Sequence, residues 1–271
     1  MAPDADRIDL NALRDAAVEC LPGAAGHPLV MVCEHAGALV PAPWRDLGLD
    51  KAYLTTHFAF DPGAGAMTRA LCADLGAPGV LARYSRLFLD YNRYPQDHEQ
   101  MRPDMGGIPV PGNLAPDDAE RALRHQIAAV PLAAAIDSAA QGRAAMVGVH
   151  SFTPVMNGHT RALDIGVLGR RDCRFLLALV DALQRAAGGL RVAANAPYDW
   201  HQVEAFCLHH HAEARGLPCV ALEFNNAALA DAGTFAAIRA LMGTTLAEVV
   251  ETLGFRSHPV VASGTSAGRA G

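Results

Sequence analysis

The chain has 271 residues, of which 51% are hydrophobic and 18% charged, and its formal net charge is −6. This composition suffices for a packed globular core, and the absence of a basic patch argues against a nucleic-acid partner. No apolar run approaches the roughly 20 residues of a membrane span, and the acidic, polar N-terminus does not resemble a signal peptide. These features favour a cytoplasmic enzyme with a small-molecule substrate and no membrane partner.

Short apolar runs alternate with helical patterns along most of the chain. Such alternation is typical of βαβ units, so we expect an α/β fold with a mixed, mostly parallel central sheet flanked by helices. We expect one catalytic domain over 27–256, between an N-terminal arm over 1–26 and a disordered tail over 257–271. The predicted elements, in chain order, are a short helix in the arm, a strand over 29–33, a short helix or turn over 50–58, a helix over 63–75, strands over 80–82 and 87–90, an aperiodic loop over 94–116, a helix over 116–140, strands over 144–149 and 165–168, a helix over 175–187, a strand over 190–193, a helix over 203–215, a strand over 219–222 and a helix over 234–253.

The six cysteines form no CxxC pair, and most of them lie in apolar runs. This pattern is typical of reduced, buried thiols rather than of a disulfide framework. Histidine is more informative, because twelve histidines are many for a chain of this length.

Three polar residues, His35, His150 and Glu223, come at the ends of predicted strands. Ligands of such sheets bind beyond the carboxyl ends of the strands, so we expect these side chains to converge. A lone histidine at a strand end is more often a hydrogen-bonded structural residue. With two such histidines and a glutamate, a metal site becomes as plausible as a purely structural role. Imidazole suits Zn²⁺, a catalytic zinc has three protein ligands and an open position, and a separate carboxylate then accepts a proton.

The third metal ligand is open at this point. A His-x-x-Glu zinc motif would need an acid at position 38, which is Ala38. Glu34 is adjacent to His35, but neighbouring strand residues point to opposite faces of a sheet. Asp61 is a good candidate, although Asp61 before a proline is equally expected to cap the following helix. His57 is the weaker option.

The stretch RYSRLFLDYNR, residues 83–93, is dense in arginine, aspartate and asparagine. On a strand, side-chain alternation would place Arg86, Asp90 and Asn92 on one face, with Arg93 beyond the strand end. A guanidinium binds a carboxylate through two parallel hydrogen bonds, so this stretch is suited to an acidic substrate. A solvated cluster of ion pairs is the alternative.

Two further segments combine histidine and arginine. Arg161 follows a Ser/Thr-Pro turn in the stretch 150–168, where it either reaches a substrate acid group or pins its loop. The stretch LHHHAEARG, residues 208–216, holds three consecutive histidines on a predicted helix. Consecutive helical residues point about 100° apart, so at most one of them, His211, is expected to face the site.

The chain contains no GxSxG elbow, no Walker loop and no GxGxxG after a strand. Serine-hydrolase, nucleotidase and dehydrogenase interpretations therefore lack the motifs on which they depend.

In order along the chain, the segments EHAG…VP, FDPGAG, YSRLFLDYNR, IPVPGN, HSFTPV…G…R and LEF resemble those of the N-formylglutamate amidohydrolase family, over about residues 29–229. That family is similar in fold to zinc carboxypeptidases and aspartoacylase. The resemblance implies a zinc-dependent hydrolase of N-acyl amino acids, with N-formyl-L-glutamate giving formate and glutamate as the reference reaction.

The resemblance also implies roles for individual residues. Glu223 would be the general base and then the acid, and Arg86 would polarise the amide carbonyl. Ligands of Zn²⁺ would be His35, His150 and, by its match to the D-x-G element of the family, Asp61. The carboxylate of the substrate would be bound by Asn92 and Arg93, with Arg161 as a further candidate.

One segment departs from the family pattern. Relatives typically carry an Arg-Gln-Asp type segment after the base, whereas this chain has Phe224-Asn225-Asn226. The departure concerns substrate preference more than hydrolysis. Two alternatives follow, a hydrolase of another amide or peptide with the same zinc site, and a metal-free binding protein that has lost catalysis. Fe²⁺, Mn²⁺ and Co²⁺ are alternative metals for such a site.

Overall fold

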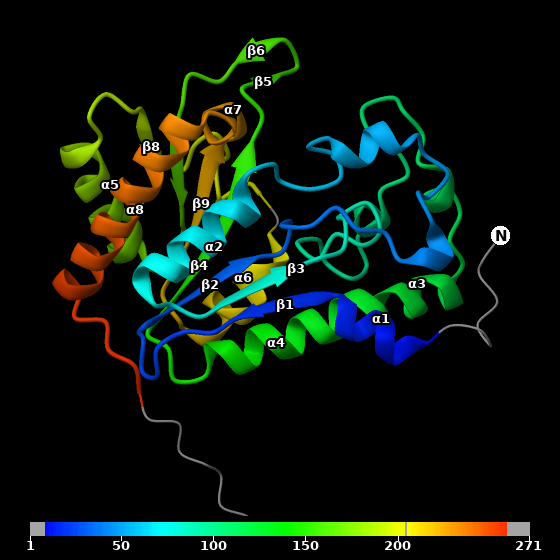
Figure 1. Cartoon of the computed structure of the whole chain (residues 1–271), viewed down its shortest axis with the longest axis horizontal. Coiled ribbons are helices and arrows are strands. Elements are labelled where there is room, and N and C mark those ends of the chain that lie inside the picture. The colour runs from blue at the N-terminus through cyan, green and yellow to red at the C-terminus, as the bar shows by residue number, and fades with distance from the viewer. Residues whose placement is uncertain (1–8, 204, 259–271) are drawn as a thin grey trace, which may run out of the picture.

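A computed structural model describes residues 9–203 and 205–258 and confirms the predicted α/β architecture (Figure 1). The main sheet has seven strands in the order β1-β3-β2-β4-β9-β7-β8. Pairing is parallel except between β1 and β3 and between β7 and β9, so the sheet is mixed and mostly parallel, as predicted. The strands are β1 (Val18–Leu21), β2 (Leu29–Cys33), β3 (Gly79–Ala82), β4 (Ala145–Phe152), β7 (Ile165–Leu168), β8 (Val192–Ala194) and β9 (Cys219–Asn225), with a separate hairpin of β5 (Val155–Met156) and β6 (His159–Thr160).

Helices cover both faces of the sheet, which explains why its central strands are apolar except near the carboxyl ends of β4 and β9. In β2, Leu29, Met31 and Cys33 join the core on one face, while Val30 and Val32 join the core on the other. The first face is covered by α2 (Ala64–Leu75), α5 (Cys173–Ala186) and α8 (Ala232–Thr252), and the second by α4 (Val130–Ala140) and α6 (Phe206–His211) (Figure 1). The remaining α-helices of the described chain are α1 (Leu10–Ala16), α3 (Asp118–Arg124) and α7 (Asn226–Ala230).

The N-terminal arm contains more structure than its sequence indicated. It holds the predicted short helix, α1, but the following residues form β1, an edge strand that was not predicted. The charged residue Glu19 interrupts the apolar pattern on which strand prediction depends. In the structure its carboxylate forms an ion pair with Arg69 of α2 at 2.6 Å. Most of the predicted disordered tail over 257–271 lies outside the described residues.

The predicted strand over 87–90 is wrong. These residues form a tight turn, in which the Phe88 amide donates to the Ser85 carbonyl at 2.9 Å. The Ser85 hydroxyl accepts from the Leu87 amide and donates to the Ala59 carbonyl, which satisfies backbone groups without a sheet partner. The run of apolar residues is buried by the fold of the loop rather than by strand pairing.

Two strands continue further than predicted. β4 runs through His150 to Phe152, and β9 runs through Glu223 to Asn225. His150 and Glu223 are register partners in the parallel β4–β9 pair, so these two residues lie side by side within the sheet. The sequence had placed both residues just beyond their strands.

Two predicted helices are shorter or interrupted. The helix expected over 116–140 is divided into α3 and α4 by a π-helical turn over His125–Ala129. Pro131 explains the interruption, because a proline cannot donate the next intrahelical hydrogen bond and crowds the preceding turn. The helix expected over 203–215 begins at Phe206 and ends at His211.

All six cysteines are free, and four of them are buried, which confirms the prediction of reduced thiols. Within the described residues, the helices are all too short or too polar to cross a membrane.

The predicted loop over 94–116 is anchored by a buried arginine of α3. Arg124 is 1% exposed and donates to Glu120 Oε1 at 2.6 Å, to Asn113 Oδ1 at 2.6 Å and to the Gly112 carbonyl at 2.8 Å. The Trp44 indole N–H donates to the same Glu120 oxygen. This network holds the loop against the core although the loop has little secondary structure.

Replacing Arg124 with methionine is expected to lower the free energy of unfolding by about 3–5 kcal/mol, because the Glu120 carboxylate would then be buried without its cationic partner. Urea unfolding followed by circular dichroism measures the loss. Arg121→Met on the same helix is the matched control and is expected to change stability by less than about 0.5 kcal/mol. Equal losses in the two variants would contradict the structural role of the network.

Candidate active site

The predicted site residues meet at the carboxyl edge of three neighbouring strands. His35 follows β2, His150 lies near the end of β4 and Glu223 lies near the end of β9. Asp61 precedes α2, and its amide donates to the His35 carbonyl at 2.9 Å. Residues distant in sequence therefore converge on one point, as the positions of the strand ends indicated.

His35, Asp61 and His150 form a compact cluster of metal-ligating side chains. One ligand atom from each residue lies within 4.8 Å of the others, and all three residues are buried. Asp61 Oδ2 lies 3.0 Å from His150 Nδ1 and 3.5 Å from His35 Nδ1. Both imidazoles thus direct Nδ1 toward the same carboxylate, an arrangement suited to two nitrogen ligands and one oxygen ligand on a single metal ion.

The second nitrogen of each imidazole contacts a different carboxylate. His35 Nε2 lies 2.7 Å from Asp90 Oδ1, and His150 Nε2 lies 3.2 Å from Glu34 Oε1. Metal-binding histidines usually donate their other N–H to a carboxylate, which fixes the tautomer and the orientation of the ring. Glu34, considered above as a third ligand, therefore supports His150 from outside the cluster.

Asp61 does not cap α2. The N-cap of that helix is Gly63, in a left-handed conformation with φ 84°, and no side chain caps it. The Asp61 carboxylate instead faces the two imidazoles and accepts from the Ser151 amide at 3.3 Å. Of the two expectations for this residue, the helix cap is wrong and the position beside the histidines is where the carboxylate lies.

The carboxylates and imidazoles of the cluster shift one another's pKa values. Burial raises the pKa of Asp61, but the two imidazoles more than offset this and hold that pKa below its usual range. Burial lowers the pKa of His150, but Glu34 and Asp61 more than offset this and hold it well above its usual value. The carboxylates therefore stabilise positive charge placed among these side chains. A bound divalent cation would supply that charge. His35 Nδ1 also fits a metal, because it is buried and has no hydrogen-bond partner in the described chain.

Glu223 lies beside the cluster but outside it. It is 7% exposed, and within the described residues its Oε2 atom has no hydrogen-bond partner. Burial raises the pKa of Glu223 to about 7, although the neighbouring His150 acts in the opposite direction. A carboxyl group with such a pKa exchanges protons readily near neutral pH, which is the property required of a general acid and base.

Arg86 lies against two carboxylates of the site. Its Nε and Nη2 atoms donate to Asp90 Oδ2 at 2.9 and 2.6 Å, and Nη1 lies 3.4 Å from Asp61 Oδ1. The proximity of Arg86 and Asp90 was predicted from strand alternation, but it arises from the turn that replaces the expected strand. Nη1 is the least tightly held end of the guanidinium.

Asn92 and Arg93 follow on the same segment. Asn92 Oδ1 accepts from the Cys207 amide at 3.0 Å, which fixes the orientation of the side-chain amide. Arg93 is partly exposed, with Nη2 3.6 Å from Glu99 Oε2.

Arg161 is held at the base of the β5–β6 hairpin. It donates to Tyr198 Oη at 3.0 Å and to Thr153 Oγ1 at 2.9 Å, and it stacks on the rings of Phe152 and Tyr198. Its Nε atom is buried and has no acceptor among the described residues. Arg161 therefore anchors its loop, which was one of the two roles expected for it. Its Nε–H remains available as a hydrogen-bond donor.

Sequence reasoning missed Tyr198 as a neighbour of the site. This residue lies in the loop after β8, and burial followed by the charge of Glu223 raises its pKa. A single tyrosine in an irregular segment gives no periodic signal, so only the folded chain reveals its proximity to Glu223.

Two other expectations for histidines are corrected. His211 does not face the cluster, because its Nε2 atom lies 2.7 Å from the Tyr91 hydroxyl and its Nδ1 atom lies 2.6 Å from Asp137. His57 is not part of the three-residue cluster and instead packs beside Phe58. Helical spacing excluded two of three neighbouring histidines, but it did not indicate what the third would contact.

Asn225, in the segment that departs from the family pattern, has a structural role. Its side chain caps α7 by accepting from the Ala227 amide at 3.1 Å and donates to the Leu163 carbonyl at 3.0 Å.

Comparison with known proteins identifies the family. The chain is similar to gene product Atu2144 from Agrobacterium tumefaciens, with 33% identity over 88% of this chain and 96% of that chain and a TM-score of 0.82. It shares the fold of an N-formylglutamate amidohydrolase from Ralstonia eutropha JMP134, with 22% identity over 88% of this chain and 99% of that chain and a TM-score of 0.60. A search of curated proteins found no match. The family model described as N-formylglutamate amidohydrolase matches residues 27–230, and the chain therefore belongs to this amidohydrolase family.

Proposed function

We propose that the protein is a zinc-dependent amidohydrolase that cleaves the amide bond of N-acyl amino acids, with N-formyl-L-glutamate as the reference substrate, giving formate and glutamate. The observation that carries this proposal is the convergence of His35, Asp61 and His150 in one buried cluster, with Glu223 beside it. Membership of the family supports the choice of reaction.

His35, Asp61 and His150 are the proposed ligands of the metal. Zinc bound by such a set lowers the pKa of a water molecule to near 7 and polarises a carbonyl oxygen. Asp90 and Glu34 would orient the two imidazoles by accepting their Nε2 protons. Each of the two imidazoles would therefore be oriented by a carboxylate outside the ligand set.

Glu223 is the proposed proton carrier. It would accept the proton that the attacking water loses and then deliver that proton to the nitrogen of the leaving amino acid, so the carboxylate is regenerated in each cycle. A pKa of about 7, raised by burial, suits both halves of this exchange. The location of Glu223 on a central strand limits its movement between the two steps.

Arg86 is proposed to polarise the amide carbonyl of the substrate. Asp90 holds its Nε and Nη2 atoms, which aims the planar group, while Nη1 has only a long contact with Asp61. A donor held in this way stabilises the oxyanion as negative charge develops on the carbonyl oxygen.

Asn92, Arg93 and Arg161 are proposed to bind the carboxylates of the substrate. Because the Cys207 amide occupies Asn92 Oδ1, the NH₂ group of that side chain is the part suited to a carboxylate. Arg161 adds a buried Nε donor without a partner among the described residues. This set of donors favours an acidic substrate over a neutral one.

A substrate panel is expected to separate this function from its alternatives. Purified protein with about one zinc per chain should release formate from N-formyl-L-glutamate, and N-formyl-L-glutamine should have a kcat/KM about tenfold lower, because it lacks one charge-assisted pair. N-acetyl amino acids and short peptides complete the panel.

The outcomes of the panel are distinct. Turnover of a peptide or another amide, but not of the formyl substrate, would favour the hydrolase of another substrate. Zinc-loaded protein without turnover of any amide, or protein that binds no zinc, would contradict the proposed reaction and favour a binding protein.

A further inference from the structure

The segment 90–93 carries three residues of the proposed site on irregular backbone. Asp90 contacts His35, and Asn92 and Arg93 are proposed to meet the substrate. The segment belongs to no helix or strand, so no regular ladder of hydrogen bonds holds it in place. Isolated backbone hydrogen bonds hold it, such as the one from the Asp90 amide to the Gln100 carbonyl at 2.7 Å, and side chains add further contacts. One residue of the segment points away from the site.

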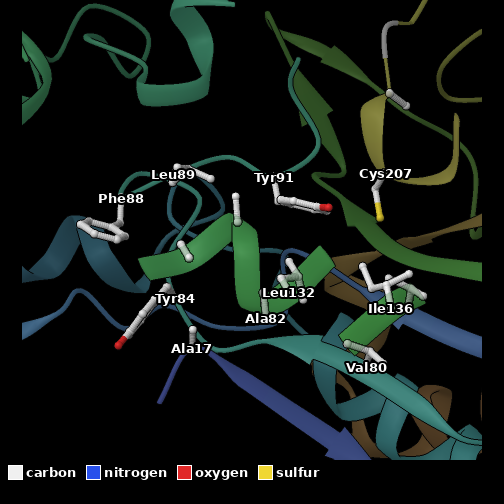
Figure 2. Packing of buried hydrophobic residues seen from close by; sticks show 14 of the residues in the cluster. Ala17, Val80, Ala82, Tyr84, Phe88, Leu89, Tyr91, Leu132, Ile136 and Cys207 are labelled. Atoms are coloured by element: carbon white, nitrogen blue, oxygen red, sulfur yellow. The ribbon is translucent and has the colours of Figure 1, made fainter. Parts of the chain in front are cut away.

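Tyr91 is that residue. It is 5% exposed and belongs to the hydrophobic core beneath the site, with Leu132 and Cys207. Figure 2 shows its ring in this core, with the hydroxyl oxygen on the side of Cys207. Tyr91 therefore links the site segment to the helices α4 and α6 below it.

The Tyr91 hydroxyl begins a chain of three contacts that runs from the core to the exposed side chain of Arg215. The hydroxyl lies 2.7 Å from His211 Nε2, His211 Nδ1 lies 2.6 Å from Asp137 Oδ1, and the same Asp137 oxygen lies 2.8 Å from Arg215 Nη2. The metal cluster and its carboxylates do not take part in this chain.

The direction of these hydrogen bonds follows from charge. Burial raises the pKa of Asp137, but hydrogen bonds from Arg215 and His211 more than offset this and lower it, so the carboxylate is ionised. Burial lowers the pKa of His211, which favours the neutral imidazole. His211 Nδ1 then donates to Asp137, and Nε2 accepts from the Tyr91 hydroxyl.

The start of α6 holds the same segment at a second point. The Phe206 amide donates to the Asn92 carbonyl at 3.1 Å, and the Cys207 amide donates to Asn92 Oδ1 at 3.0 Å. One short helix therefore binds Asn92 through its first turn and Tyr91 through its last residue, His211.

We propose that Tyr91, His211 and Asp137 form a positioning relay that holds segment 90–93 against α6. The relay sets how Asp90 meets His35 and how Asn92 meets a substrate carboxylate. Its kinetic consequences rest on the proposed function, whereas its effect on the segment does not. None of the three residues touches the reacting atoms, so each acts through its neighbours.

The first test measures the segment itself. In Tyr91→Phe the ring stays in the core, but His211 Nε2 loses its donor. We expect the amides of Asn92, Phe206 and Cys207 to exchange hydrogen about tenfold faster than in the wild type. Tyr84→Phe is the matched control, because its hydroxyl donates to the Leu13 carbonyl at the same length, 2.7 Å, in the same core but away from the segment. The control should leave these three amides unchanged.

The second test measures metal and substrate. We expect Tyr91→Phe to bind zinc about tenfold more weakly in competition with a chelator and to raise KM about tenfold, with kcat at saturating zinc within about threefold of the wild type. His211→Phe should behave in the same way. The double variant should be no worse than His211→Phe, because Tyr91→Phe removes only a hydrogen bond that His211→Phe has already removed.

Each outcome decides the proposal. Wild-type exchange of the three amides in Tyr91→Phe, or equal acceleration in Tyr84→Phe, would overturn the relay. Additive effects in the double variant would also overturn it. If the wild type hydrolyses no amide, the proposed function fails, and the exchange experiment alone still decides whether the relay exists.

Discussion

Replacing Glu223 with glutamine is expected to lower kcat for amide hydrolysis by at least about 10³-fold while zinc content stays at about one per chain. Glutamine keeps the size of the side chain but cannot accept the proton of the attacking water. Glu223 lies beside His150 without belonging to the cluster of candidate ligands, so its loss should not release metal. Steady-state kinetics and elemental analysis of the same preparation measure the two quantities.

Glu213→Gln is the matched control for this variant. Glu213 is equally buried, at 7% exposure, but its partner is Arg170, which is not one of the candidate metal ligands. We expect the control to lose some stability and to keep near-normal kcat. A Glu223→Gln variant with near-normal kcat would show that another group carries the proton and would refute the mechanism proposed for this residue.

Replacing His150 or His35 with alanine is expected to lower zinc content from about one per chain to near zero, with loss of turnover. Each variant removes one of three buried ligand atoms and leaves a carboxylate, Glu34 or Asp90, without its imidazole partner. The variants should therefore also be less stable, and circular dichroism must show that they fold before zinc content is compared.

His57→Ala is the control for the ligand variants. His57 lies in the same loop region as Asp61 but outside the three-residue cluster, so this variant should retain its zinc. Loss of zinc from His57→Ala, or normal zinc content in folded His150→Ala, would contradict the ligand set. The comparison separates the general effect of removing a histidine from the loss of a ligand.

The convergence of the site could be predicted because strand ends are visible in sequence. His35, His150 and Glu223 each end an apolar run, and neighbouring parallel strands bring their carboxyl ends to one edge. Asp61 could be named as a candidate ligand, but its position before a proline equally suggested a helix cap. Only the folded loop, with Gly63 at the start of α2, directs the carboxylate toward the imidazoles.

The contacts that support the imidazoles could not be predicted from sequence. Asp90 is 55 residues from His35, and Glu34 contacts His150 rather than its own neighbour. Such pairs depend on how loops pack over the sheet, and no periodicity encodes them. The incorrect strand over 87–90 has the same origin, since the apolar run is buried by a turn that Ser85 stabilises from its side chain.

The candidate ligand His150 and the proposed proton carrier Glu223 lie on β4 and β9, two interior strands paired over seven residues, whereas Asn92, Arg93 and Arg161 lie on loops. Central strands open last in a folded protein, and surface loops tolerate change best. Under the proposed function, natural or laboratory selection could therefore change the preferred substrate by altering these loops without disturbing the strands that hold His150 and Glu223. Within such a family, substrate preference would diverge faster than chemistry.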